Sequence, residues 1–181
     1  MRFENPPLSD HPLVELRPIE ARDLASWFAY LTLPAVQEHT SWSLASPSDL
    51  THFVGSSESG APDGNARFAI ALRDGGELVG TAGFQAVSAR HHSAELAYDL
   101  APPFWGRGLA SWVARSLTAW ARREANVVRV QAVVLDSNLR SIAVLERAGF
   151  EREGLLKSYR FVRGTPRDFW MYASTQRPRR D

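Results

Sequence analysis

A short glycine-containing segment in the middle of the chain has the residue types of an anion-binding loop. It follows a strand-like run that ends at Leu100, and it reads Trp105-Gly106-Arg107-Gly108-Leu109-Ala110. Glycines let the backbone approach a bulky anion, and the amides that begin a following helix carry a partial positive charge. The segment therefore predicts a diphosphate-binding site, and the alternative is a tight turn between a strand and a helix.

A dinucleotide-binding fingerprint competes for the same segment. Gly106-x-Gly108-x-x-Ser111 approaches GxGxxG, but the third glycine is missing. That fingerprint belongs after the first buried strand of a repeated strand–helix series. Here the segment is preceded by hairpin patterns and followed by only one further crossover, so we favour a site for a single pyrophosphate.

The segments on either side of the loop predict how it is positioned. Residues 93–100 alternate polar and apolar side chains, as a half-buried strand does, until Pro102-Pro103 ends the pattern. From 108 to 125, apolar side chains recur every three or four positions, which indicates an amphipathic helix. Residues 127–135 are β-branched and typical of a buried strand. This order predicts a parallel crossover with the loop at its turn.

Antiparallel hairpins are predicted on both sides of this crossover, at 66–87 around Asp74-Gly75-Gly76 and at 150–174 around a turn at 163–166. The remaining patterns predict a first strand at 13–17, a helix capped by Asp23, a short helix after Ser46-Pro47, a loop at 55–65 and a helix after Asn138 that ends at Gly149. The predicted fold class is mixed α/β, with a central, mostly antiparallel sheet flanked by helices.

Bulk composition limits the class of protein. With 181 residues, 44% of them hydrophobic and 23% charged, the chain has the balance of one globular domain. We expect this domain to span 1–181, with an irregular lead-in at 1–12 and a tail at 175–181. A net charge of +1 gives no general attraction to nucleic acid or to an anionic membrane. The first residues are charged and proline-broken, and no run of about 18 apolar residues occurs. We expect a cytoplasmic location.

Cysteine and histidine bear on metal and covalent chemistry. The chain has no cysteine, so it has neither a thiolate metal ligand nor a catalytic thiol. Of its five histidines, only His91 and His92 are close in sequence, and neighbouring residues on a strand point to opposite faces. We therefore expect no metal site.

Two motifs at the correct separation make the chain resemble the GNAT acetyltransferases, and within them the RimJ/RimL type, which acetylates protein N-termini and related amines. The first is the loop, where that superfamily has Q/R-x-x-G-x-G/A and this chain has Trp105, Gly108 and Ala110. The tryptophan departs from the general pattern but is similar to the WGKG form of RimJ-like members. The second runs from Asp136 to Phe150 and is similar to D-x-N-x-x-S-x-x-V-L-E-x-x-G-F. The resemblance covers residues 13–174, and it includes Leu16-Arg17-Pro18, Leu78-Val79-Gly80 and Arg167-Asp168.

The resemblance implies a GNAT fold with a splay between two strands and acetyl-CoA as the cosubstrate. Leu100, at the strand end, would pair with the pantetheine arm, and the Asn138 amide would contact the same arm. For Asn138, a helix N-cap is the alternative. The cofactor-binding residues implied in this way are Leu100, Trp105, Gly106, Arg107, Gly108, Leu109, Ala110, Ser111 and Asn138, with the amides from 107 to 111 at the pyrophosphate.

Aminolysis of a thioester needs a neutral amine, removal of its proton and a donor to the departing thiolate. Many GNAT enzymes use as this donor a tyrosine on the helix after the asparagine, but this chain has Leu145 there. The resemblance points instead to Ser141, for which an ordinary surface serine is the alternative. For the base it points to Glu95, for which a solvated carboxylate is the alternative. Asp99 and Tyr98 are further candidates for the base.

The implied reaction is direct transfer of an acetyl group from acetyl-CoA to a primary amine. The expected acceptor is a protein or peptide N-terminus, and the alternatives are a small amine, such as an amino acid, polyamine or aminoglycoside, or a degenerate module that binds acyl-CoA without turnover. Acceptor selection is expected in residues 36–65 and 159–165. No nucleic-acid or membrane partner is expected, and the protein is expected to be a monomer or homodimer.

Overall fold

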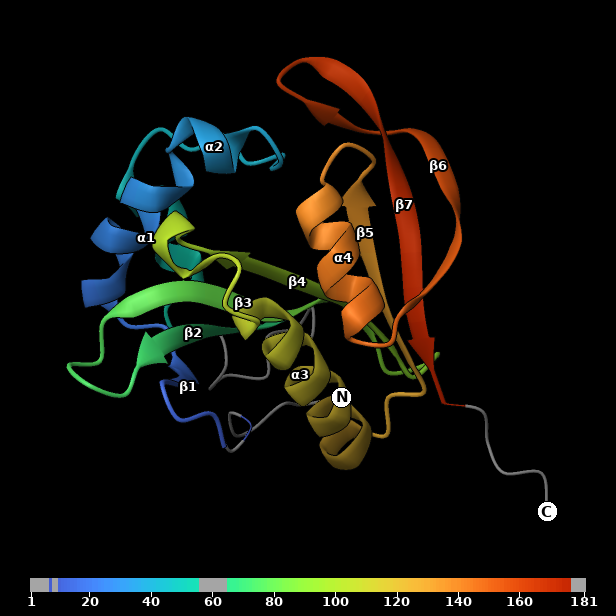
Figure 1. Cartoon of the computed structure of the whole chain (residues 1–181), viewed down its shortest axis with the longest axis horizontal. Helices are drawn as coiled ribbons and strands as arrows, with labels where there is room; N and C mark the ends of the chain where they lie inside the picture. The colour runs from blue at the N-terminus through green and yellow to red at the C-terminus, as the bar shows by residue number, and fades with distance from the viewer. Residues whose placement is uncertain (1–6, 8–9, 56–64, 177–181) are drawn as a thin grey trace.

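A mixed β-sheet with helices on both faces forms the body of the molecule (Figure 1). This computed structural model describes residues 7, 10–55 and 65–176. Within these residues the sheet has seven strands, in the order β1-β2-β3-β4-β5-β7-β6. The strands are β1 (Val14–Pro18), β2 (Ala66–Leu72), β3 (Leu78–Ser88), β4 (Ser93–Leu100), β5 (Arg129–Leu135), β6 (Glu151–Val162) and β7 (Thr165–Thr175). The α-helices are α1 (Leu24–Leu31), α2 (Pro34–Gln37), α3 (Leu109–Ala125) and α4 (Leu139–Arg147), and the 3₁₀ turns are η1 (Ala21–Asp23), η2 (Pro47–Phe53) and η3 (Pro102–Phe104).

The parallel crossover predicted from the sequence is confirmed. Strand β4 passes through the loop and α3 to β5, and the two strands pair in parallel at Ser93↔Arg129, Ala94↔Val130 and Glu95↔Gln131. Beyond Glu95 this pairing stops, although β4 continues to Leu100 and β5 to Leu135. The two strands therefore diverge, and the splay that the family resemblance implied is present. The other strand pairs in the described residues are antiparallel.

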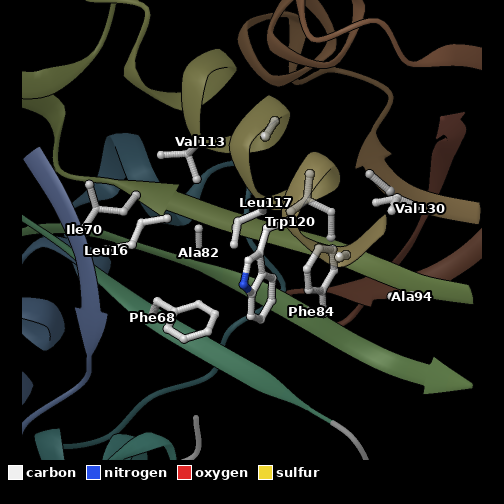
Figure 2. Close-up of a cluster of buried hydrophobic side chains, with 14 of the residues drawn as sticks. Leu16, Phe68, Ile70, Ala82, Phe84, Ala94, Val113, Leu117, Trp120 and Val130 are labelled. Atoms are coloured by element: carbon white, nitrogen blue, oxygen red, sulfur yellow. The ribbon is translucent and has the colours of Figure 1, made fainter. Parts of the chain in front are cut away.

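Side chains that alternate along β2 build a core on each face of the sheet. Phe68 is fully buried beneath α3, where the Trp120 ring meets it edge to face at 5.5 Å (Figure 2). Leu117 on the same helix is also fully buried in this cluster. Ala69, one residue further along β2, packs in a second cluster with Trp27 of α1. This two-residue period fixes α3 on one face and α1 on the other.

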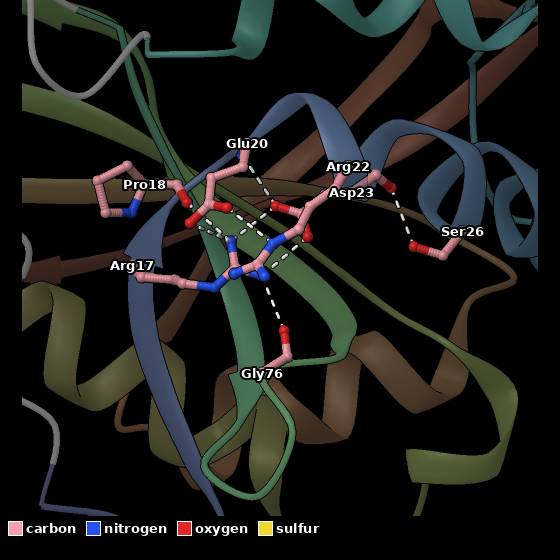
Figure 3. Close-up of polar contacts among 7 residues, drawn as sticks. All are labelled: Arg17, Pro18, Glu20, Arg22, Asp23, Ser26 and Gly76. Atoms are coloured by element: carbon pink, nitrogen blue, oxygen red, sulfur yellow. Dashed lines mark hydrogen bonds and ion pairs between the residues drawn. The ribbon is translucent and has the colours of Figure 1, made fainter.

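The N-terminal helix is anchored differently from our expectation. Asp23 precedes α1, but its carboxylate does not cap that helix. Its oxygens instead accept hydrogen bonds from the Arg17 guanidinium at 2.7 and 2.8 Å and from the Glu20 amide at 2.8 Å (Figure 3). Arg17 also donates to the Gly76 carbonyl at 2.9 Å. The predicted cap is therefore wrong because the Asp23 carboxylate bonds to Arg17 and to the Glu20 amide before η1, and Arg17 joins β1 to the turn between β2 and β3.

The turns and loops lie largely where the sequence predicted them. Gly149 has a φ of 82° just beyond α4, as a helix-terminating glycine should. Arg163 and Gly164, with φ of 49° and 74°, form the turn between β6 and β7, and the expected turn residues Thr165 and Pro166 already belong to β7. The helix expected after Ser46 is the 3₁₀ segment η2.

Some expectations fall outside the described residues. These are most of the lead-in at 1–12, the loop positions 56–64 and the tail from 177 onward. Among the helices that are described, none has the length and apolarity needed to cross a membrane.

Candidate active site

A cavity of about 750 Å³ occupies the splay between β4 and β5. Its walls are formed by residues 96–100 of β4, residues 132–135 of β5, the glycine loop and α4. Residues 35–36 and 39–42, after α1, close it on one side, and Arg160 of β6 and Phe169 of β7 close it on the other. The cleft therefore connects the predicted anion loop with both segments in which we expected acceptor selection.

The glycine loop has a backbone conformation that favours glycine at two positions. Gly106 and Gly108 have φ of 74° and 78°, a region that favours glycine. A Cβ built at either position would meet nothing within 4 Å. Among the described residues no side chain caps α3, so its first amides keep their donors for a ligand. Because Leu109, Ala110 and Ser111 also line the cavity, the site can hold an anion at a helix N-terminus.

Trp105 occupies the strand end that we expected the pantetheine arm to use. Its indole Nε1 donates to the Leu100 carbonyl at 2.7 Å. That carbonyl keeps one lone pair for another donor. The Arg140 guanidinium lies over the Trp105 ring, 4.7 Å from its centroid. Trp105 therefore ties the loop to β4 and supports a cation beside the anion site.

Two arginines of α4 lie beside the loop. Arg140 and Arg147 of α4 both line the cavity, although the sequence analysis did not single them out. Arg107 was predicted to contribute its backbone amide, and its side chain is exposed, lies 5.4 Å from the Phe104 ring and does not line the cavity. The sequence could have indicated these two residues, because both belong to the helix that was expected after Asn138. They lie one and eight residues beyond its first residue.

The start of α4 brings the predicted polar residues together. Asn138 is the N-cap, and its Oδ1 accepts from the Ser141 amide at 3.0 Å. The N-cap alternative is thus confirmed, and the Asn138 side chain still lines the cavity. The Ser141 Oγ lies 2.7 Å from the hydroxyl of Tyr98 on β4. Leu145, at the position where related enzymes carry a tyrosine, is buried in the core.

Glu95 lies where β4 and β5 begin to diverge. It is 5% exposed, so its interpretation as a solvated carboxylate is wrong. Its Oε1 accepts from Gln85 Nε2 at 2.7 Å and from Arg160 Nη2 at 3.0 Å. Arg160 was not identified by residue type, but it belongs to the segment 159–165 in which we expected acceptor selection. The sequence could have indicated this contact, because the last hairpin carries a cation, Arg160, that could pair with the strand carboxylate Glu95.

Asp99, four residues further along β4, is held in another way. Donors that surround its carboxylate are Trp27, Tyr30, Arg67 and Thr81. The Arg67 guanidinium lies between 5.5 and 5.7 Å from the rings of Trp27, Trp42 and Phe53. Burial and the neighbouring Asp99 raise the pKa of Tyr30 well above its usual value, so this tyrosine remains a donor. We infer that Asp99 fixes β4 beneath α1.

The chain belongs to the GNAT acetyltransferases, because the family model described as an acetyltransferase (GNAT) domain matches residues 14–151. The fold described above is that of this family. One similar protein is the uncharacterised N-acetyltransferase YoaA of Bacillus subtilis (strain 168). It is 37% identical over 59% of this chain and 60% of its own length. The ribosomal protein uS5 alanine N-acetyltransferase of Escherichia coli (strain K12) is 31% identical over 55% of this chain and 52% of its own length.

The similar solved structures include one determined in complex with CoA-disulfide. Mycobacterium smegmatis RimJ in complex with CoA-disulfide has a TM-score of 0.75 and 28% identity, over 91% of this chain and 86% of that one. The chain spans only about three fifths of the length of the first curated relatives that it matches. These comparisons therefore show the family and the fold, and they leave the reaction and the acceptor to be tested.

Proposed function

We propose that the protein is an acetyl-CoA-dependent N-acetyltransferase that acts on a primary amine, most favourably a protein or peptide N-terminus. The observation that carries the proposal is the splay between β4 and β5, whose cavity joins the open amides of α3 to a buried carboxylate. When bound, acetyl-CoA supplies an activated acetyl thioester, and the chain's own residues supply binding, orientation and the removal of a proton.

The residues present fit a diphosphate with an extended arm. We assign the pyrophosphate to the amides that end the glycine loop and begin α3, since these donors are uncapped in the described structure. Arg140 and Arg147 add positive charge on the α4 side. We assign the arm to the groove beside Leu100 and Asn138. Both of these residues already make one hydrogen bond, so each can contribute only its remaining donor or acceptor capacity.

Glu95 is proposed as the group that takes the proton of the amine, directly or through one water. It lines the cavity at the narrow end of the splay, where we propose that the acetyl group lies. Arg160 and Gln85 both donate hydrogen bonds to its Oε1, so they fix the orientation of the carboxylate. Neither of them bonds to Oε2. Ser141 is proposed as the hydroxyl that stabilises the departing sulfur.

Charge balance favours an N-terminus over a polyamine as the acceptor. The carboxylates that line the cavity, Glu95 and Asp99, are each paired with an arginine, Arg160 and Arg67 respectively. A site for a polycation would need acidic groups whose charge is not already balanced. An acceptor with one amine beside neutral peptide groups matches this lining better, and the ribosomal protein acetyltransferase relative supports the same choice.

A thiol-release assay with acetyl-CoA tests the proposal against a panel of N-terminal peptides, amino acids, polyamines and aminoglycosides. We expect steady thiol release with peptides and none above background with polyamines. Release only with a small amine would move the function to that alternative. Tight CoA binding without release on any amine would instead support a binding module.

The glycine loop is tested separately by Gly108→Val. A side chain there would enter the open space beside the α3 amides at a backbone φ that β-branched residues avoid. We expect the affinity for CoA to fall by more than about tenfold, roughly 1.4 kcal/mol or more, as measured by calorimetry on the folded variant. Thermal shift with CoA and with NAD provides the control, since stabilisation by NAD alone would overturn the assignment of the loop.

A further inference from the structure

Tyr98 and Ser141 form a hydroxyl pair inside the cleft. Tyr98 comes from β4 and Ser141 from the first turn of α4, and both line the cavity. Their oxygens lie 2.7 Å apart, a normal distance for a hydrogen bond between hydroxyls. The contact therefore links the two elements that face each other across the groove.

Two hydroxyls that share one hydrogen bond keep one hydrogen for a third group. If the Tyr98 phenol donates to Ser141 Oγ, the serine hydrogen remains. If Ser141 donates, the phenol hydrogen remains, and in the described structure its nearest other acceptor is the Ser141 carbonyl at a long 3.4 Å. In both arrangements the pair has one donor that is weakly used by the protein itself.

We propose that Tyr98 and Ser141 act as one coupled donor to the leaving sulfur, with Tyr98 holding Ser141 Oγ so that the serine hydrogen faces the cleft. This inference rests on the proposed acetyltransferase function and deepens it. It also explains how the family's chemistry can proceed with Leu145 at the usual tyrosine position: the phenol reaches the same helix from β4.

The pair stabilises charge and does not give up its protons. The amine nitrogen forms a bond to the acetyl carbon, the carbon–sulfur bond breaks, and its electron pair goes to sulfur. The nitrogen loses one proton to the base, and sulfur gains one from solvent, so amine plus thioester gives amide plus thiol. The hydroxyl pair lowers the barrier by donating a hydrogen bond while negative charge develops on sulfur.

The environment of Tyr98 agrees with this role. Burial raises the pKa of Tyr98 well above its usual value, and the Ser141 hydrogen bond opposes that shift only in part. The phenol therefore remains protonated at neutral pH and keeps a hydrogen to donate to Ser141. Without the phenol, a serine hydroxyl on a helix readily turns to a backbone carbonyl of the preceding turn, and the cleft would lose its donor.

A double-mutant cycle in the full-length protein tests the coupling. With a good acceptor and saturating acetyl-CoA, Tyr98→Phe and Ser141→Ala should each lower kcat by roughly 10²-fold, the usual loss for one such donor. The double variant should lose about the same factor as either single variant, because both changes remove one shared donor. Tyr172→Phe is the matched control. That hydroxyl contacts Glu146 of the same helix and does not line the cavity, so kcat should not change.

A binding measurement follows the donor without turnover. The thiol of bound CoA, titrated through its thiolate absorbance, should ionise at a lower pH in the wild type than in Tyr98→Phe or Ser141→Ala, by about one pH unit for a tenfold effect. Ser141→Thr, which keeps the hydroxyl, should restore the wild-type midpoint. Thermal unfolding of each variant checks that it is folded.

Three results would overturn the inference. Wild-type kcat in Tyr98→Phe would show that Ser141 acts alone. Losses that multiply in the double variant would show two independent groups. An unchanged thiol midpoint in both single variants would show that the pair does not contact sulfur. Absence of turnover in the wild type with every amine would instead refute the proposed function, and the thiol titration would still report on the pair.

Discussion

The ion pairs on the two sides of the splay differ in how firmly they are held. On the N-terminal side, Arg67 and Asp99 have side chains that are 9% and 7% exposed, and the Arg17–Asp23 pair is similarly enclosed. On the C-terminal side, Arg160 reaches Glu95 with a third of its side chain exposed, and Arg129–Glu153 is open to solvent. We therefore expect the N-terminal wall of the cleft to be rigid and the C-terminal wall to adjust to an acceptor.

This difference follows from the position of each pair in the sheet. Arg67 lies on an inner strand between β1 and β3, and its guanidinium is enclosed by the aromatic rings of α1 and η2. Arg160 lies on β6, which is one of the two edge strands of the described sheet. Register shifts occur in β6 between Leu156 and Arg160. An edge strand with an irregular register gives a side chain room to move.

The largest effect is expected at Asp99. Asp99→Asn keeps the shape but leaves the Arg67 charge buried without its partner. Breaking a buried pair in this way typically costs about 3 to 5 kcal/mol, so we expect the free energy of unfolding to fall by that amount in urea denaturation. Adding Arg67→Met should recover part of the loss. A decrease below about 1 kcal/mol would place this pair with the open ones and remove the contrast.

The next effect is expected on catalysis at Glu95. Glu95→Gln keeps the hydrogen-bonding shape and removes the proton acceptor. We expect kcat/KM to fall by about 10² to 10⁴ while the Kd for CoA stays nearly unchanged. Part of the loss should return at higher pH, because more of the amine is then already neutral. Near-wild-type kcat/KM at pH 7 would exclude Glu95 as the base, and the open pair would then serve orientation only.

A smaller effect is expected at Asp23, and it depends on pH. Burial acts to raise the pKa of Asp23, but the Arg17 hydrogen bond and the Glu20 amide outweigh it, so the pKa lies below its usual 3.8. The charged form thus stabilises the fold above the unfolded-state pKa, and this contribution is lost as the pH falls through the folded-state pKa. We expect Asp23→Asn to cost about 2 kcal/mol near pH 7 and to flatten the loss of stability below about pH 4. Equal acid slopes in both proteins would contradict this.

The smallest effect is expected at Glu153. Its pKa is also lowered, chiefly by the Arg129 hydrogen bond, but both side chains are partly exposed. Solvent-exposed pairs contribute about 0 to 1 kcal/mol, and salt screens them. Glu153→Gln should therefore change the unfolding midpoint in urea only slightly, and less still at 1 M salt. A loss as large as that at Asp23 would show that the two sides are equally rigid.

Local features of the site could be predicted from the sequence. The left-handed glycines 106 and 108, the N-cap at Asn138 and the turn beyond α4 depend on residues within one helical turn, so motif spacing was sufficient for them. The alternation of polar and apolar residues along the strands and the expected parallel crossover likewise predicted the mixed sheet. The Asp23 cap was mispredicted because a competing partner, Arg17, lies on the preceding strand.

Contacts between distant segments could not be predicted in the same way. Tyr98 meets Ser141 across 43 residues, and Arg160 meets Glu95 across 65. These pairings depend on how β5 diverges from β4 and on where the last hairpin then lies. Residue types alone do not encode that geometry. The sequence could identify the hydroxyls and charges that were available, whereas the structure was needed to pair them.

The short parallel contact between β4 and β5 also has a consequence for how the chain folds. Strands β2, β3 and β4 follow one another through short turns, so their contacts close short loops, which favours early formation. Strand β5 can join them only after α3 has crossed the sheet, and it then pairs with β4 at positions 129–131. We expect the junction to open more readily than the hairpins on either side, as separate cooperative units do. The opening that admits a ligand would then form after the hairpins on either side of it.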